Sequence, residues 1–233
     1  MIIFGDCYVE IKKIKSGFID LIIIDPPYLI SKKSNFKLFK NNIDKIVIQK
    51  FNYSHDFGQW DNSNIDWEFL FNEFYRILKK GGSVIIFNDV WKSSILKKYA
   101  LQNKFKQPRV GVWIKNNPPP INSKYNYLSN SMEFFFTFVK NGKPTFNSNY
   151  DKGVYQYPIC HGKERFKHPT QKPLSLIKDL ILKHSNENDL VLDLFAGTGT
   201  TGVACVETNR RYILIENKEE FYNICRYRIY KNS

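Results

Sequence analysis

A carboxylate, two prolines and an aromatic ring stand directly behind a strongly apolar run near the start of the chain. Asp25-Pro26-Pro27-Tyr28 follows Phe18-Ile19-Asp20-Leu21-Ile22-Ile23-Ile24. The run predicts a buried strand that stops at the prolines, because proline has no N–H to donate to a sheet. A carboxylate held by stiff residues at a strand end can accept hydrogen bonds from a ligand. The alternative is a plain strand-ending turn that Asp25 caps.

A glycine-rich turn follows a second apolar run, Leu190 to Phe195. The turn reads Gly197-x-Gly199-x-x-Gly202, it opens a helix, and Glu216 ends the next apolar run. Glycines let the backbone approach a ligand closely, and a carboxylate on the neighbouring strand tip can accept from both ribose hydroxyls. The pattern therefore predicts a nucleoside cofactor, either a nicotinamide or flavin dinucleotide or S-adenosylmethionine.

Three features favour S-adenosylmethionine over a dinucleotide. A dinucleotide-binding unit usually leads its domain, whereas this one comes near the end of the sequence. Asp193 adds a negative charge, which repels a pyrophosphate but can accept from an ammonium group. Hydride transfer also has no use for the Asp25 turn.

The elements that must position these residues alternate between strands and helices. Strands are predicted at 18–24, 83–87, 110–115, 132–140, 190–195 and 212–216. Helices are predicted from Asp66 to Gly81-Gly82, at about 90–102, after Pro173, from Gly197 to near Asn209, and over 221–228. The alternation indicates parallel pairing with right-handed crossovers, whereas 132–140 should pair antiparallel with 110–115 at a sheet edge. Residues 141–167 have no clear period and are predicted to form a loop region.

The composition indicates a folded, strongly basic protein. The chain has 233 residues, 42% of them hydrophobic, and a net charge of +13. Such a surface suits a polyanion, although a biased coding sequence would also enrich lysine. Residues 31–58 interleave lysines with aromatic rings, as a nucleic-acid strand requires for phosphate contacts and stacking, or as a solvated insertion would show. The candidate nucleic-acid contacts are Lys32, Lys33, Lys37, Lys40, Lys50, Lys163 and Arg165.

The cysteines indicate neither disulfides nor a metal site. Cys7, Cys160, Cys205 and Cys225 form no C-x-x-C pair and have no histidine at metal-ligand spacing. No signal-peptide pattern is present and no apolar run reaches about 18 residues. We therefore expect a cytoplasmic protein with reduced thiols, no metal and no membrane contact.

Three motifs in a fixed order carry a specific resemblance. Asp25-Pro26-Pro27-Tyr28 comes first, His168-Pro169-Thr170-Gln171-Lys172-Pro173 second, and the segment from Asp193 to Gly202 third. In this order they resemble the DNA amino-methyltransferases of the permuted, beta class, of the D-P-P-Y type found in restriction–modification systems. The resemblance covers almost the whole chain. It implies an α/β, Rossmann-like fold for S-adenosylmethionine-dependent methyl transfer, with a seven-stranded mixed sheet, helices on both faces and a circularly permuted motif order.

The resemblance also implies a domain organisation and residue roles. Residues 1–233 form one methyltransferase domain, with a basic aromatic loop insertion at 31–58 and a small target-recognition region at 141–167. The catalytic residues are Asp25, Pro26, Pro27 and Tyr28. The cofactor-binding residues are Asp6, Cys7, Asp25, Pro169, Thr170, Lys172, Asp193, Phe195, Ala196, Gly197, Thr198, Gly199, Thr200, Glu216 and Asn217.

The implied reaction moves the methyl group of S-adenosylmethionine to the N6 amino group of adenine in a specific duplex DNA sequence, with the base flipped out and direct in-line transfer. Family members that methylate cytosine N4 more often carry serine where this chain has Asp25. The alternatives are a cytosine-N4 enzyme, an enzyme acting on RNA or a protein amide, and a DNA-binding protein with a non-catalytic methyltransferase fold. A homodimer and a separately encoded restriction endonuclease are hypotheses for the partners besides double-stranded DNA.

Overall fold

The computed structural model describes residues 1–27, 65–118, 130–166 and 170–232. Residues up to Pro26 and from Asp66 onward belong to one compact unit. The predicted loop insertion at 31–58 lies outside the described residues, as do Tyr28, His168 and Pro169.

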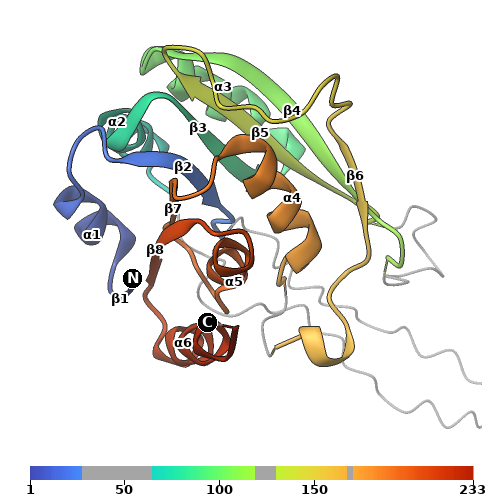
Figure 1. Cartoon of the computed structure of the whole chain (residues 1–233). Helices are drawn as coiled ribbons and strands as arrows, with labels where there is room; N and C mark the ends of the chain where they lie inside the picture. The colour runs from blue at the N-terminus through green and yellow to red at the C-terminus, as the bar shows by residue number, and fades with distance from the viewer. Residues whose placement is uncertain (28–64, 119–129, 167–169, 233) are drawn as a thin grey trace, which may run out of the picture. The chain divides into compact units, whose positions relative to one another are not determined.

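One sheet of eight strands forms the centre of this unit (Figure 1). Its strand order is β1-β8-β7-β2-β3-β5-β4-β6. Strand β5 runs antiparallel to its neighbours β3 and β4, whereas the other neighbouring pairs are parallel. The strands are β1 (Ile2–Phe4), β2 (Ile19–Ile24), β3 (Leu78–Asn88), β4 (Phe105–Lys115), β5 (Met132–Lys140), β6 (Val154–Tyr157), β7 (Leu190–Asp193) and β8 (Arg211–Glu216).

Helices cover both faces of the sheet (Figure 1). On one face, apolar residues of α4 and α5 pack with Leu21, Ile85 and Val191 of the central strands. On the other face, Phe71 of α2 meets the rings of Phe105 and Phe138. Central strands buried on both faces explain why their sequences are continuous apolar runs and do not alternate. The helices are α1 (Cys7–Lys13), α2 (Trp67–Ile77), α3 (Ser93–Gln102), α4 (Leu174–His184), α5 (Thr200–Glu207) and α6 (Glu219–Asn232).

The start of helix α2 agrees with the sequence prediction, whereas its end does not. Asp66 caps its first turn by accepting from the Phe69 N–H at 3.0 Å, as predicted. The helix ends at Ile77, however, and does not continue to Gly81-Gly82. Leu78 is already extended and pairs with Ile19 of β2, because the sheet recruits this residue into β3. The predicted helix was therefore too long at its carboxyl end.

The region predicted as loop, 141–167, adds a strand to the sheet. Strand β6 pairs in parallel with β4, and its Tyr155 lies against Phe135 with ring centroids 5.4 Å apart. The Trp113 indole N–H donates to the Tyr157 carbonyl at 2.8 Å. The predicted antiparallel pairing of 110–115 with 132–140 is confirmed, but β6 lies beyond this pair and forms the sheet edge. The predicted class is confirmed, with eight strands in place of seven.

Candidate active site

Four carboxylates lie at the carboxyl ends of four adjacent parallel strands. Asp6 follows β1, Glu216 ends β8, Asp193 ends β7, and Asp25 follows β2. Ligands of open α/β sheets bind at this edge. Two motifs that stand far apart in the sequence, the Asp25 turn and the glycine turn, are therefore neighbours in the fold.

Asp193 is almost fully buried and holds the glycine turn in shape. One of its oxygens accepts from the Phe195 N–H at 2.9 Å and the other from the Thr201 hydroxyl at 2.6 Å. Burial, with a smaller contribution from the nearby charges of Asp25 and Glu216, raises the pKa of Asp193 to about 7. A cationic ligand at this edge would stabilise the ionised form.

Glu216 reaches across to the same turn. Its carboxylate accepts from the N–H of Gly197 and from the N–H of Lys218, each at 2.8 Å. Burial raises the pKa of Glu216 as well. Gly199 has a φ of +82°, and a Cβ at this position would lie 2.5 Å from the sulfur of Cys225. Glycine is therefore required here by both backbone and packing.

Asp6 and Cys7 continue the edge at β1. The Asp6 carboxylate caps α1 by accepting from the N–H groups of Tyr8 and Val9. Burial raises the pKa of the Cys7 thiol to about 12, so this side chain is a neutral thiol at physiological pH. Asn217 is exposed next to Glu216.

The hydrogen-bond acceptors at this edge fit S-adenosylmethionine. Carboxylates suit ribose hydroxyls and an ammonium group, which donate hydrogen bonds, whereas they repel a pyrophosphate. Asp193, Glu216 and Asp6 line three neighbouring strand ends around the glycine turn. The residues present therefore agree with the cofactor that the sequence predicts.

Asp25 stands at the end of a chain of alternating charges. Its Oδ2 lies 2.5 Å from Nζ of Lys172, which also lies 3.2 Å from Oε2 of Glu133. The other oxygen of Glu133 lies 2.8 Å from Nζ of Lys115. The cofactor role predicted for Lys172 stays a prediction, but its amine contacts the carboxylate of the Asp25 turn.

The second motif connects the cofactor turn with the 141–167 region. The Gln171 side chain donates to the Glu164 carbonyl at 2.8 Å and accepts from the Thr198 hydroxyl at 3.2 Å. Arg228 of α6 donates to the carbonyl and the hydroxyl of Thr198 at 2.8 and 2.9 Å and lies over the ring of Phe166. These contacts fix Thr198 from two sides.

The remaining predicted site residues lie on the segments named above or outside the residues that the structure describes. Pro26, Ala196 and Thr200 are buried, whereas Pro27, Phe195 and Thr170 are half-buried. Lys163 is in the 3₁₀ turn Gly162–Glu164, which Arg165 ends with an exposed side chain. The predicted contacts Lys32, Lys33, Lys37, Lys40 and Lys50 fall outside the described residues.

The sequence prediction missed four side chains at or near this edge: Glu133, Lys115, Asn88 and Arg228. Asn88 ends β3, is 3% exposed, and its Nδ2 has no hydrogen-bond partner within the described ranges. Two signals were available in the sequence. Glu133 is a charge inside an apolar strand, and Arg228 is a cation on the apolar side of a helix.

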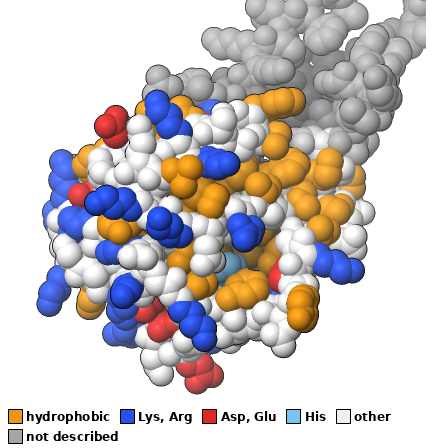
Figure 2. All heavy atoms as spheres, turned by 90° about the horizontal axis from the view of Figure 1, so that it is seen from above, with side chains coloured by type: hydrophobic (Ala, Val, Ile, Leu, Met, Phe, Trp, Pro, Cys, Tyr) orange, Lys and Arg blue, Asp and Glu red, His pale blue; other side chains and the backbone are white. Residues whose placement is uncertain are grey.

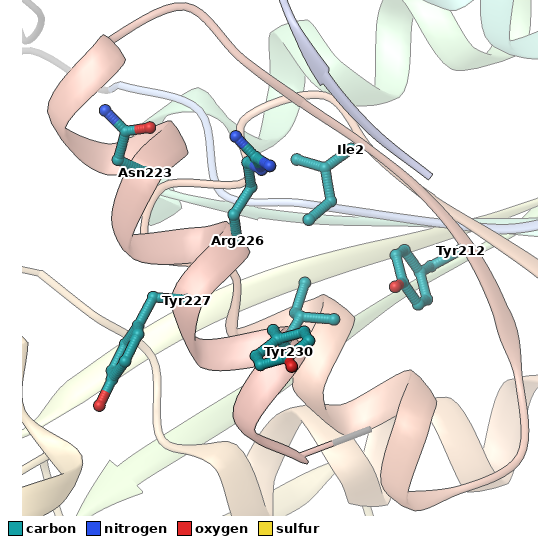
Figure 3. A pocket seen from close by; sticks show the side chains of 7 residues that line it. Ile2, Tyr212, Asn223, Arg226, Tyr227 and Tyr230 are labelled. Atoms are coloured by element: carbon teal, nitrogen blue, oxygen red, sulfur yellow. The ribbon is translucent and has the colours of Figure 1, made fainter.

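A hollow beside α6 is lined by residues other than the predicted site residues (Figure 3). It is lined by Tyr227 and Tyr230 of α6, and by Ile2 and Tyr212 from the amino-terminal parts of β1 and β8. It therefore lies toward the opposite edge of the sheet from the carboxylates. Within the described ranges, no cluster of three or more histidine, cysteine or acidic side chains could hold a metal ion, and no helix is long and apolar enough to cross a bilayer.

An open α/β sheet with carboxylates and a glycine turn at the carboxyl ends of its parallel strands, in a chain that carries the D-P-P-Y motif, is typical of Rossmann-like methyltransferases. A family model described as DNA methylase matches residues 19–226. The chain belongs to this family of N6 and N4 DNA methylases. The predicted resemblance and the predicted enzyme class are confirmed.

Relatives match over nearly the full length of the chain. It is 32% identical to the type II methyltransferase M2.MboI of Moraxella bovis, covering 97% of this chain and 86% of that protein. It is 30% identical to the DNA adenine methyltransferase YhdJ of Escherichia coli, over 94% and 79% of the two chains.

Solved structures agree with the fold. The M1.HpyAVI complex with SAM matches with a TM-score of 0.73 and 28% identity over 98% of both chains. The cytosine-N4-specific PvuII DNA methyltransferase shares the fold, with a TM-score of 0.74 at 17% identity, over 97% of this chain and 85% of that one.

Proposed function

We propose that this DNA methyltransferase transfers the methyl group of S-adenosylmethionine to the N6 amino group of adenine in a specific sequence of double-stranded DNA. One observation carries the proposal. Asp25 and the cofactor turn behind Asp193 follow β2 and β7, which are adjacent parallel strands. An amino group held by Asp25 would therefore stand beside a ligand held by the turn.

The cofactor side of the site is acidic for a reason. S-adenosylmethionine supplies an electrophilic methyl group on a sulfonium centre. Glu216 can accept from the ribose hydroxyls while it keeps its bond to the Gly197 N–H, because each carboxylate oxygen has two acceptor positions. Asp193 can accept from the ammonium group, and Asp6 lies on the strand end beyond Glu216, where the family places the cofactor's adenine.

The Asp25 turn acts on the target base. The exocyclic nitrogen of adenine is a poor nucleophile, because its lone pair is delocalised into the ring. Asp25 can accept one amino hydrogen and the Pro26 carbonyl the other, which draws the nitrogen toward tetrahedral geometry. The carboxylate then stabilises the positive charge that develops on nitrogen, and in-line positioning lowers the entropic part of the barrier.

Tyr28 would stack on the target base after it leaves the duplex, since the amino nitrogen cannot be reached inside the helical stack. Cytosine presents a similar amino group, and a cytosine-N4 enzyme shares this fold. Adenine is favoured because this chain carries aspartate at position 25 and because a relative at 30% identity is named a DNA adenine methyltransferase.

The molecule's charge supports DNA as the substrate. The net charge is +13, and basic side chains predominate over acidic ones on the face in Figure 2. We infer that the enzyme works in the cytoplasm, where DNA of a restriction–modification host lies. We also infer a separately encoded endonuclease, since several relatives are named type II methyltransferases, whereas a homodimer stays a hypothesis that rests on the family resemblance alone. Sedimentation as a monomer at working concentration would exclude the dimer.

Substitution of Asp25 tests the function. In Asp25→Ala, methyl transfer from labelled S-adenosylmethionine to duplex DNA should fall by at least about 10²-fold, because the acceptor of the amino hydrogen is gone. Cofactor binding, measured by calorimetry, should persist, which shows that the fold survives. Digestion of the methylated DNA to nucleosides identifies the base. Undiminished transfer by the variant, or labelled N4-methylcytosine from the wild type, contradicts the proposal.

A further inference from the structure

The charges behind Asp25 form one connected group that draws on four separate segments. Asp25 follows β2, Lys172 precedes α4, Glu133 lies in β5, and Lys115 ends β4. Strand β5 is antiparallel, so its beginning lies at the same sheet edge as the ends of β3 and β4. The reversed strand is thus what brings Glu133 to the Asp25 side of the sheet.

We infer that Glu133 is a positioning residue for methyl transfer, which acts on Asp25 through Lys172. This inference rests on the proposed function. The Lys172 side chain is 5% exposed, and its ammonium group is shared between Asp25 at 2.5 Å and Glu133 at 3.2 Å. The Glu133 side chain is 22% exposed and is itself shared between Lys172 and Lys115.

Sharing controls how strongly Lys172 holds Asp25. A buried ammonium group with a single carboxylate partner directs its whole charge to that partner, since little water is present to screen it. Such a pair would weaken Asp25 as an acceptor for the amino hydrogens. With Glu133 taking part of the interaction, Lys172 orients Asp25 without neutralising it.

The charge state of Glu133 agrees with this role. Burial acts to raise the pKa of Glu133, but Lys172 and Lys115 outweigh it and lower the pKa below its ordinary value. The carboxylate is therefore ionised at neutral pH. The charges of the two carboxylates and the two ammonium groups sum to zero, so burial of the cluster places no net charge inside the protein.

The substitution Glu133→Gln removes the charge and keeps the size of the side chain. We expect kcat for methyl transfer to DNA to fall about 10- to 100-fold, while KM for S-adenosylmethionine and for DNA changes by less than about two-fold. Glu133→Asp, which keeps the charge, should recover part of kcat. The matched control is Glu207→Gln, which removes a carboxylate paired with Lys178 at 2.7 Å on the surface and should leave kcat unchanged.

A double-mutant cycle separates positioning from general stability. If Glu133 acts through Lys172, Glu133→Gln should have no further effect on kcat in a Lys172→Met background. Additive losses in the two variants overturn the inference, as does a Glu133→Gln enzyme with a lower Tm and an unchanged kcat. If Glu133→Gln does not fold, Glu133→Asp in the same cycle distinguishes coupled from additive losses.

The proposed function and this inference fail in different ways. A wild-type enzyme that transfers no methyl group to DNA overturns the proposed function and the inference with it. A wild-type enzyme that is active, an Asp25→Ala variant that is inactive and a Glu133→Gln variant with wild-type kcat overturn the inference alone.

Discussion

Protonation of Asp193 should compete with binding of the cofactor. The pKa of Asp193 is raised to about 7, because burial penalises the charge and because Asp25 and Glu216 add repulsion. In the free enzyme, Asp193 is therefore about half protonated near neutral pH. Binding of a cation beside it favours the ionised form, so binding near pH 7 must release protons.

We expect the affinity for S-adenosylmethionine to fall as the pH drops below about 7. The bound state has the lower pKa, so binding weakens by up to about ten-fold per pH unit below about 7. Calorimetric titration between about pH 5.5 and 8.5 measures this slope and the proton release.

Asp193→Asn provides the control, because an amide does not titrate in this range. The variant should bind more weakly than the wild type at about pH 7.5, and its affinity should not fall further between about pH 7 and 5.5. A wild-type affinity that is constant down to pH 5.5 contradicts this account of Asp193.

At the scale of elements, the turn between β7 and α5 combines two demands on one glycine. Gly199 has a φ of +82°, and the space for a Cβ is occupied by the sulfur of Cys225 from α6. Gly17 has a comparable φ of +63° but nothing within 4 Å of a Cβ. Comparison of Gly199 with Gly17 therefore separates two contributions to stability that a side chain would change, namely backbone strain and packing.

Gly199→Ala should lower the free energy of unfolding by about 2–4 kcal/mol, from about 1 kcal/mol of backbone strain plus overpacking against α6. Gly17→Ala should cost only the backbone part, about 1 kcal/mol. Urea unfolding measures both. Gly199→Ala should also weaken cofactor binding, because the turn must shift. Equal losses in the two variants would show that packing against Cys225 is unimportant.

The sequence predicts those elements whose residues decide them locally. The strand at Met132–Lys140 is found with its observed bounds, and Asp66 is identified as the start of α2. Strand β6 was missed, because only four residues form it and its stability comes from pairing with β4.

The residues of the candidate site likewise fall into those that the sequence predicts and those that it does not. Asp25, Asp193 and Glu216 could be found because each follows or ends an apolar run at a strand tip. Glu133 stands out as a charge in an apolar strand, but its contact with Lys115 and Lys172 could not be predicted, since that contact depends on β5 lying between β3 and β4. That strand order is a property of the assembled sheet, and it produces no recognisable spacing of residues in the sequence.

At the scale of the whole molecule, the excess of positive charge should appear in DNA binding. Each lysine that neutralises a phosphate releases counterions and adds about 0.9 to the slope of log affinity against log salt. The sequence places Lys32, Lys33 and Lys37 in the basic aromatic stretch that follows the Asp25 turn. Replacing all three with serine should reduce the slope by up to about 2.7 and weaken DNA binding.

The control must remove the same charge elsewhere. Lys97, Lys98 and Lys104 are exposed on and behind α3, and their replacement by serine lowers the net charge equally. Fluorescence anisotropy with duplex DNA at several salt concentrations compares the two triple variants. Equal losses would mean that overall charge matters and that the stretch makes no specific contacts. Cofactor affinity should be unchanged in both.

The position of β1 has a consequence for how the enzyme is made. Strand β1 pairs with β8, and β2 pairs with β7 on the side away from β3, so the cofactor side of both strands needs partners from residues 190–216, far later in the sequence. The cofactor edge cannot assemble before those partners have been synthesised. A growing chain that already displays the Asp25 turn therefore lacks its methyl donor, and a ribosome that stalls midway releases no fragment able to mark DNA.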